Sequence, residues 1–207
     1  MAWALEMRFV RGGFNEADAT EGVLHARAAL AHGRDDANAL AVAALAILHL
    51  GRDFHAASSA IARALALSDS CAMALFFGAH IHAFSGEAPI AEDYAARALR
   101  LSPFDPLAFV ADQAIALVQI REGMFDDAVV SFAKGVQANP RFSWLHAEHS
   151  AALALAGRID EAKTAARRLL ELEPNFRVRP MMEFLVFMRP ELSSAISTGL
   201  CQAGLPE

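Results

Sequence analysis

Along most of the chain, apolar segments of helical length alternate with short breaks that contain glycine, aspartate or proline. These segments come in pairs, in which the first ends near a glycine and the second ends shortly before a proline. Glycine tolerates the left-handed conformation that ends a helix, and proline blocks its continuation. The pattern therefore predicts pairs of helices. The turn glycines are Gly51, Gly86, Gly123 and Gly157, and the closing prolines are Pro103, Pro140 and Pro174.

The pairs repeat with a nearly constant period. The segments "ASSAIARALALSD" and "AEDYAARALRLSP" align at an offset of thirty-four residues, and Gly123 and Gly157 stand at the same offset. The step from Gly86 to Gly123 is thirty-seven, because three residues are inserted around "FDPLA". A weaker copy, "HARAALAHG", precedes these units. The period and the glycine, alanine and proline pattern resemble those of the tetratricopeptide repeat (TPR).

A single unit of this size cannot bury its own apolar stripe, so stacked units must bury it jointly. We therefore expect an all-α, TPR-type superhelix of four to five helix pairs with one concave and one convex face. Residues 1–34 should form a degenerate N-terminal helix pair, with a turn at Gly12-Gly13, and residues 35–174 the repeats. Residues 175–207 should form a capping segment, in which Glu191–Leu200 is helical and the apolar stretch Met181–Met188 packs on the last repeat or on a partner subunit.

Three segments of the chain together resemble one bacterial family. The linker "LSPFDPLAF", the stop "LLELEPNF" and the tail "GLCQAGLPE" are similar to the C-terminal repeat region of class III adenylate/guanylate cyclase-like proteins and their TolB-like relatives. This resemblance implies that the chain is the sensory or assembly part of a signalling protein. The chain contains no cyclase sequence. The residues that fit the tail are Gly199, Leu200, Ala203, Gly204, Leu205, Pro206 and Glu207.

Composition and charge narrow the function classes. The chain is 55% hydrophobic and carries a net charge of -6, which excludes a disordered chain and disfavours nucleic-acid phosphates as a ligand. The longest apolar run, Ala39–Leu50, is shorter than the roughly 20 residues of a membrane span. The N-terminus lacks the features of a signal peptide, and Cys71 and Cys201 are far apart in sequence. We expect a cytoplasmic protein with reduced cysteines and without membrane insertion.

Candidate chemistry is sparse. Of eight histidines, His146 and His149 are spaced to share a helix face, but no third ligand follows at helical spacing. Neither cysteine has a histidine nearby, and no nucleophile elbow or phosphate-binding glycine loop is present. The sequence therefore predicts no enzyme activity, no cofactor and no metal site.

The concave face is the expected binding surface, because the first helix of each TPR unit lines it. Counting back from the turn glycines selects a mostly apolar set, without the lysine, asparagine and arginine pattern of chaperone-tail receptors. Such a surface suits an amphipathic helix or an apolar peptide. The set is Asn38, Ala41, Leu45, His49, Met73, Phe76, His80, Phe84, Val110, Gln113, Leu117, Arg121, Trp144, Ala147, Ala151 and Leu155. The residues expected to contact the peptide are Phe76, His80, Phe84, Gln113, Leu117, Arg121 and Trp144.

Two functions remain open. The first is a protein-interaction module that binds a protein or peptide in the concave groove. The second is a structural module through which a larger protein forms a homodimer, since class III cyclase domains work as dimers. Aromatic residues in the predicted groove could equally be interhelix core, because its register is uncertain by about one residue.

Overall fold

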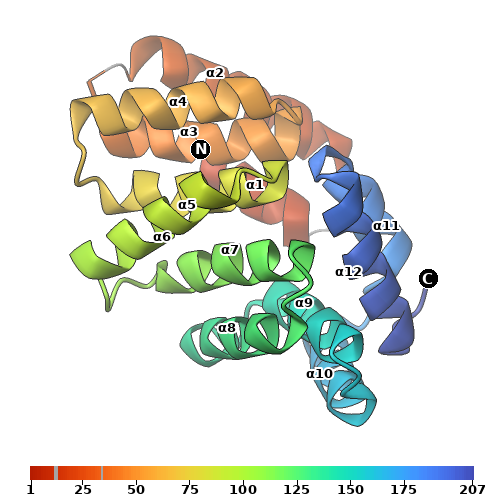
Figure 1. Cartoon of the computed structure of the whole chain (residues 1–207). Helices are drawn as coiled ribbons and strands as arrows, with labels where there is room; N and C mark the ends of the chain where they lie inside the picture. Colours follow the sequence, from red (N-terminus) through yellow and green to blue (C-terminus); the bar gives the residue numbers. More distant parts are fainter. Residues whose placement is uncertain (12–13, 34) are drawn as a thin grey trace.

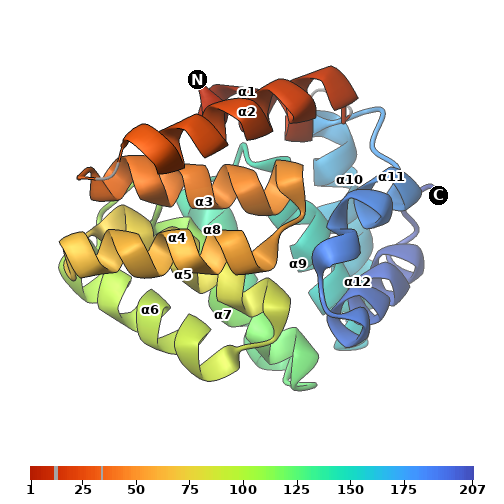
Figure 2. The ribbon, with the colours of Figure 1, turned by 90° about the horizontal axis from the view of Figure 1, so that it is seen from above.

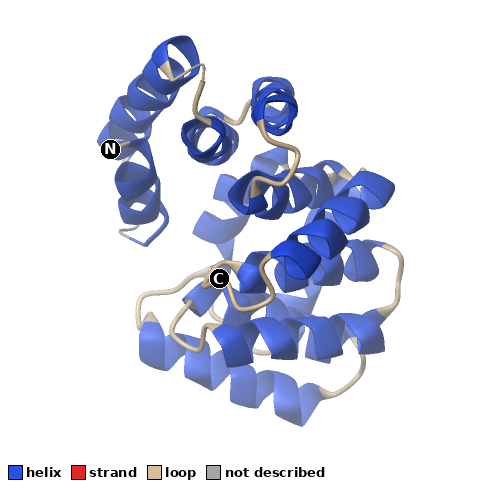
Figure 3. Ribbon diagram, turned by 90° about the vertical axis from the view of Figure 1, so that its left-hand side faces the viewer, coloured by secondary structure: helices blue, strands red, loops and turns tan. Residues whose placement is uncertain are grey.

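The computed structural model describes residues 1–11, 14–33 and 35–207, and this part of the chain is helical without any strand (Figure 3). The predicted turn at Gly12-Gly13 lies outside the described residues. The expected all-α, TPR-type superhelix is confirmed. Its elements are α1 (Ala2–Arg11), α2 (Glu16–His32), α3 (Ala37–Gly51), α4 (Phe54–Leu67), α5 (Ala72–Ser85), α6 (Ala88–Leu101), α7 (Ala108–Arg121), α8 (Phe125–Ala138), α9 (Ser143–Leu155), α10 (Ile159–Leu172), α11 (Val178–Phe184), the short 3-10 helix η1 (Leu185–Phe187) and α12 (Pro190–Gln202).

Ten of these helices form five antiparallel pairs that stack in chain order (Figure 1). Within each pair the two helices pack along their length, as α3 packs on α4 and α7 on α8. The first helices also pack on one another, α1 on α3, α3 on α5 and α5 on α7. They therefore form the inner layer of the superhelix, and the second helices form the outer layer.

The turns inside the pairs show why the sequence is punctuated as it is. Gly86, Gly123 and Gly157 follow the ends of α5, α7 and α9 with φ of 81°, 76° and 77°, a left-handed conformation that glycine adopts without strain. The first repeat differs, because Gly51 stays in the helix and Arg52 takes the left-handed position with φ of 53°. The predicted role of Gly51 as a helix end is thus shifted by one residue.

Small residues near the start of the outer helices let the two helices of a pair approach closely. The alanines that recur there are fully or almost fully buried against the inner helix. They bring the backbones together at a spacing that a longer side chain would prevent. These residues are Ala57, Ala91, Ala128 and Ala162.

The C-terminal segment folds back onto the inner layer. Helix α12 packs chiefly on α9 and also on α7, the inner helices of the last two pairs. Between α11 and α12 the chain reaches α5, where the Arg189 amide donates to Phe84 O at 3.0 Å and its guanidinium donates to Ser85 O at 2.7 Å. The tail thus lies beside repeats that precede it by about a hundred residues, and α11 comes close to the N-terminal helices (Figure 2).

The last residues of the chain end α12 and connect it to α11. Gly204 adopts a φ of 81° after α12, and the Leu205 amide donates to Leu200 O, as in a Schellman motif that ends a helix. Leu200 and Leu205 are both buried, and Pro206 O accepts a hydrogen bond from the Val178 amide at the start of α11. The last residues therefore tie α12 to α11.

In the part of the chain that the structure covers, no helix is both long and apolar enough to span a membrane.

Gly199 fixes the distance between α12 and α9. A Cβ atom there would lie 2.5 Å from Ala151 O and 2.8 Å from Ala151 Cα, both backbone atoms that cannot rotate away. We expect Gly199→Ala to lower the free energy of unfolding by about 1–3 kcal/mol, measured by chemical denaturation. The matched control is Gly51→Ala, whose Cβ would meet nothing closer than 3.6 Å and should be neutral or stabilising by up to about 1 kcal/mol. Equal effects at the two sites would contradict close packing of α12.

Candidate binding cavity on the concave face

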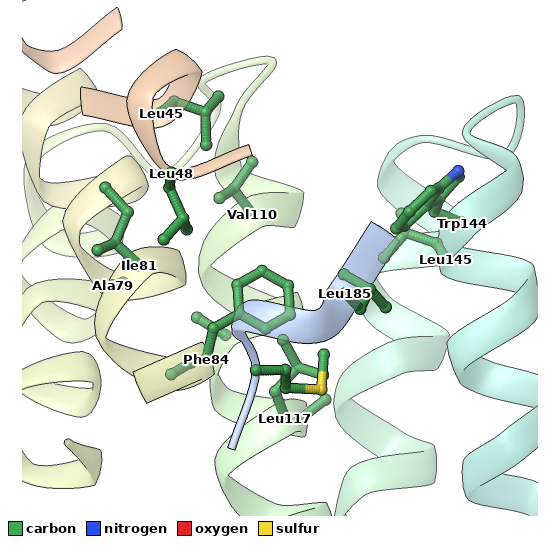
Figure 4. Packing of buried hydrophobic residues seen from close by; sticks show 14 of the residues in the cluster. Leu45, Leu48, Ala79, Ile81, Phe84, Val110, Leu117, Trp144, Leu145 and Leu185 are labelled. Atoms are coloured by element: carbon green, nitrogen blue, oxygen red, sulfur yellow. The ribbon is translucent and has the colours of Figure 1, made fainter. Parts of the chain in front are cut away.

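The concave face is lined by the inner helices and is partly filled by the chain itself. Phe184 and η1 enter it from the tail, and α1 closes it from the N-terminal side. Figure 4 shows Leu185 of η1 between Phe84 of α5 and Leu145 of α9, so the tail occupies space between these inner helices. The concave face therefore does not form a long open groove.

An aromatic cluster around Phe184 holds this arrangement together. The Phe184 ring contacts Phe9, Phe14, His49 and Trp144, with ring centroids 5.2–5.7 Å apart. These partners come from α1, the α1–α2 connection, α3 and α9. A single side chain thus joins the first helix pair, the second pair and the last pair across the concave face.

Beside this cluster, a cavity of about 240 Å³ remains unfilled. Its rim carries exposed or half-buried residues such as Trp3, Met7 and Pro106, whereas Phe77 and Phe109 lie buried deeper in its wall. The lining is mostly apolar and aromatic, with a few polar groups. The complete lining is Trp3, Glu6, Met7, Val10, Leu45, His49, Phe77, His80, Phe84, Pro106, Leu107, Phe109, Val110, Gln113, Asn139, Phe142, Trp144 and Phe184.

Glu6, His49 and His80 lie together among the polar side chains of the lining. Glu6 of α1 is 4% exposed, and its Oε1 lies 2.7 Å from His49 Nδ1 of α3. The His49 ring meets the His80 ring edge-on at 5.5 Å, and burial together with the neighbouring His49 holds the pKa of His80 well below its usual range. Glu6 Oε2 and His80 Nδ1 are buried and have no hydrogen-bond partner among the described residues.

A second buried carboxylate lies behind the cavity wall. Glu148 of α9 is fully buried, and its Oε2 accepts a hydrogen bond of 2.6 Å from Gln113 Nε2 of α7. Burial raises the pKa of Glu148 to about 8, although the hydrogen bond from Gln113 acts in the opposite direction. Glu148 is therefore largely protonated at neutral pH, and it fixes the side chain of Gln113 at the cavity.

The seven predicted peptide contacts divide into two groups. His80, Phe84, Gln113 and Trp144 come together at the cavity. Phe76 and Leu117 are completely buried between helices and do not line it. Arg121 also lies apart from it, where its guanidinium donates to Gly86 O at the α5–α6 turn. As contacts to a ligand, all seven stay a prediction.

The contribution of α1 to the cavity is not among the predicted contacts, although the repeat period indicates it. The weak N-terminal copy precedes the first clear unit by thirty-five residues. One such step back from Asn38, Ala41 and Leu45 leads to Trp3, Glu6 and Val10, all of which line the cavity. Phe184 had no comparable signal, because it stands outside the repeat.

The two histidines on α9 lie in different surroundings. His146 Nε2 lies 3.0 Å from Pro140 O, and burial, followed by the nearby His146, lowers the pKa of His149 to about 4. Within the described ranges, no three His, Cys, Asp or Glu side chains lie close enough together to hold a metal ion.

Comparison with known proteins supports the fold. No protein-family model and no curated protein matches the chain. Among solved structures, the type IV pilus biogenesis factor PilW aligns with a TM-score of 0.66 at 18% identity, over 98% of this chain and 86% of its own. PilF of Pseudomonas aeruginosa aligns with a TM-score of 0.63 at 15% identity, over 94% of this chain and 86% of its own. TTC0263, a TPR protein of Thermus thermophilus, aligns with a TM-score of 0.56 at 21% identity, over 78% of this chain and 88% of its own.

At these identities the likeness concerns the fold alone, which is that of a TPR superhelix.

Phe184→Ala should remove the ring that joins the tail to both ends of the superhelix. We expect a loss of about 3–5 kcal/mol in the free energy of unfolding, because a buried phenylalanine leaves a large cavity when it is truncated. The matched control is Val186→Ala two residues later, whose side chain is 64% exposed and should matter by about 0.5 kcal/mol or less. Denaturation curves of the two variants that coincide would refute the proposed role of Phe184.

Glu148→Gln should change how stability depends on pH. The pKa of Glu148 is about 8 in the folded chain, above its ordinary value of 4.5, so the folded chain holds this proton more tightly than the unfolded chain does. The resulting contribution to stability is complete below pH 4.5. That contribution is lost as the pH rises from 4.5 towards 8, because the unfolded chain releases the proton first. The glutamine variant should therefore gain stability relative to the original chain over this range, by up to about 5 kcal/mol.

The measurement is the free energy of unfolding of both chains from pH 4 to 9. The control Glu92→Gln alters an exposed carboxylate on α6 and should give a curve parallel to that of the original chain. A constant difference between the Glu148→Gln and original curves would show that Glu148 ionises normally.

Proposed function

We propose that the chain is a protein-interaction module that binds a peptide segment at the concave face, with one side chain of the peptide inserted into the cavity. The observation that supports this most is a pair of neighbouring hollows that share a wall. The cavity of about 240 Å³ and a second hollow of about 490 Å³ are both bordered by Val10 and Trp144. Two such hollows suit a chain that presents side chains at regular intervals.

The two hollows differ in chemistry. The second is lined in part by Glu173, Asn175 and Arg177 from the segment that follows α10. A peptide with an anchor residue for the cavity and polar residues beside it would match both. YrrB, described as a TPR protein with an unusual peptide-binding site, has the same fold, with a TM-score of 0.52 at 17% identity over 86% of this chain and 92% of its own.

The resemblance of the tail to cyclase-like proteins suggests the setting of this module. In that setting the chain would serve as the regulatory C-terminal region of a bacterial signalling protein in the cytoplasm, without catalysis of its own. This part of the proposal rests on the tail and linker sequences. A cyclase or DNA-binding segment encoded in frame before Met1 would support it, and an unrelated reading frame there would count against it.

Peptide display on the full chain tests the binding proposal. We expect selected peptides to lose roughly thirtyfold in affinity on Trp144→Ala, because an interface anchor contributes about 2 kcal/mol or more. Trp3→Ala at the rim, where the side chain is 37% exposed, should also weaken binding and provides a variant whose effect on folding is smaller. Val130→Ala on the outer helix α8 should have no effect. Peptides that bind both tryptophan variants as tightly as the original chain would refute the proposed site.

Self-association is the alternative, and one feature of the surface favours it. Phe104, in the turn that carries the three inserted residues, is 97% exposed, and Leu101 beside it is 49% exposed. Apolar side chains in such a position can join two copies of a chain. In this case sedimentation should show a dimer that Phe104→Ser dissociates and that Trp144→Ala leaves intact.

A further inference from the structure

The cavity contains a carboxylate whose hydrogen bonding is incomplete. Glu6 is almost completely buried, and within the described part of the chain its partner is His49, which contacts Oε1 alone. A buried carboxylate normally accepts several hydrogen bonds, and an acceptor without a donor costs free energy. Glu6 thus lines an unfilled cavity with a carboxylate that lacks one of its donors.

The surroundings of Glu6 favour a positive charge. Of the described side chains that line the cavity, none is a lysine or an arginine. His80 stays neutral near pH 7, because burial and the adjacent His49 lower its pKa. Aromatic rings also line the cavity, among them Trp3, Phe77 and Phe109 from three different helices, and the faces of such rings attract cations. Glu6 and His49 are therefore the groups with which a charged ligand would have to fit, and the lining offers an anion no lysine or arginine.

The size of the cavity limits the ligand. An apolar cavity of roughly 150 Å³ is sufficient for benzene, whereas drug-sized ligands occupy roughly 300–1,000 Å³. At about 240 Å³, this cavity fits a single ring or a short alkyl chain together with one small polar group.

We propose that the cavity binds a primary ammonium group on a short apolar stem, with the ammonium donating to the Glu6 carboxylate and the stem lying against the aromatic wall. The inference rests on the proposed peptide-binding function and names the chemistry of the group that enters the cavity. The same group occurs in a lysine side chain and in a free arylalkylamine. An apolar peptide, which the sequence pattern favours, would carry no ammonium group at this position.

The full chain itself reports on occupancy of the cavity. Its two tryptophans, Trp3 and Trp144, both line the cavity, so the intrinsic fluorescence changes when a ligand enters. Three probes of similar shape are titrated separately, 2-phenylethylamine, 2-phenylethanol and 3-phenylpropionate. We expect the amine to bind at least tenfold more tightly than the alcohol, and the carboxylate to bind most weakly.

Glu6→Gln then tests the carboxylate itself. This variant keeps the size of the side chain, and we expect it to reduce the affinity for the amine at least tenfold, to that of the alcohol. Unchanged binding of the alcohol shows that the cavity is still formed. The control Glu16→Gln removes an exposed carboxylate from α2 and should leave all three affinities unchanged. Equal binding of amine and alcohol to the original chain, or an amine affinity that Glu6→Gln leaves intact, would overturn the proposal.

Peptides selected by display separate this inference from the function on which it rests. If lysine is the source of the ammonium, replacing it by norleucine should cost at least tenfold in affinity for the original chain and little for Glu6→Gln. Free amine binding without a lysine dependence in the peptides would assign the cavity to a small amine. The ammonium site would be refuted if peptide binding depended on Trp144 but not on lysine, and if the amine probe bound no more tightly than the alcohol. Peptide binding itself would then still be supported. Failure of both peptides and probes to bind would overturn both proposals.

Discussion

The ring of Phe184 is the contact on which the shape of this protein depends. Taken alone, stacked helix pairs form an open superhelix whose first and last units never meet. Here Phe184 contacts Phe9 and Phe14 at one end and Trp144 at the other, so the inner layer is closed into a compact arrangement. Because Phe184 comes from the tail, the segment after the repeats determines how the repeats curve and what remains of their concave face.

Closure is possible because α12 can approach the inner helices very closely. Gly199 leaves its backbone in contact with Ala151 of α9, and the hydrogen bonds from Arg189 to Phe84 O and Ser85 O anchor the connection before it on α5. These contacts hold α11 and η1 inside the concave face. The tail therefore fills part of the concave face, and the space left over is the cavity of about 240 Å³.

The regular part of the fold could be predicted from the sequence, since it is encoded locally. The turn glycines, the buried alanines and the stops before proline each act within a few residues, so the period shows them directly. The position of the tail could not be predicted in the same way, because Arg189 and Phe84 are about a hundred residues apart and no repeat relates them. Four of the predicted contact residues do lie at the cavity. Phe76 and Leu117 are instead completely buried, and the period alone does not distinguish a buried position on an inner helix from one at the cavity.

The two buried carboxylates show how packing separates a structural group from a candidate binding group. Glu148 is enclosed on all sides, so the cost of its charge is relieved by a proton, and its pKa rises to about 8. Glu6 stands beside His49 at the wall of a space large enough for a ligand. A donor that enters this space can complete the hydrogen bonding of Glu6. Glu148 Oε1 also lacks a partner among the described residues, but Glu148 does not line the cavity. Chemistry is thus expected where incomplete hydrogen bonding and unfilled volume coincide, and in this protein they coincide where α1 meets the inner helices of the next two pairs.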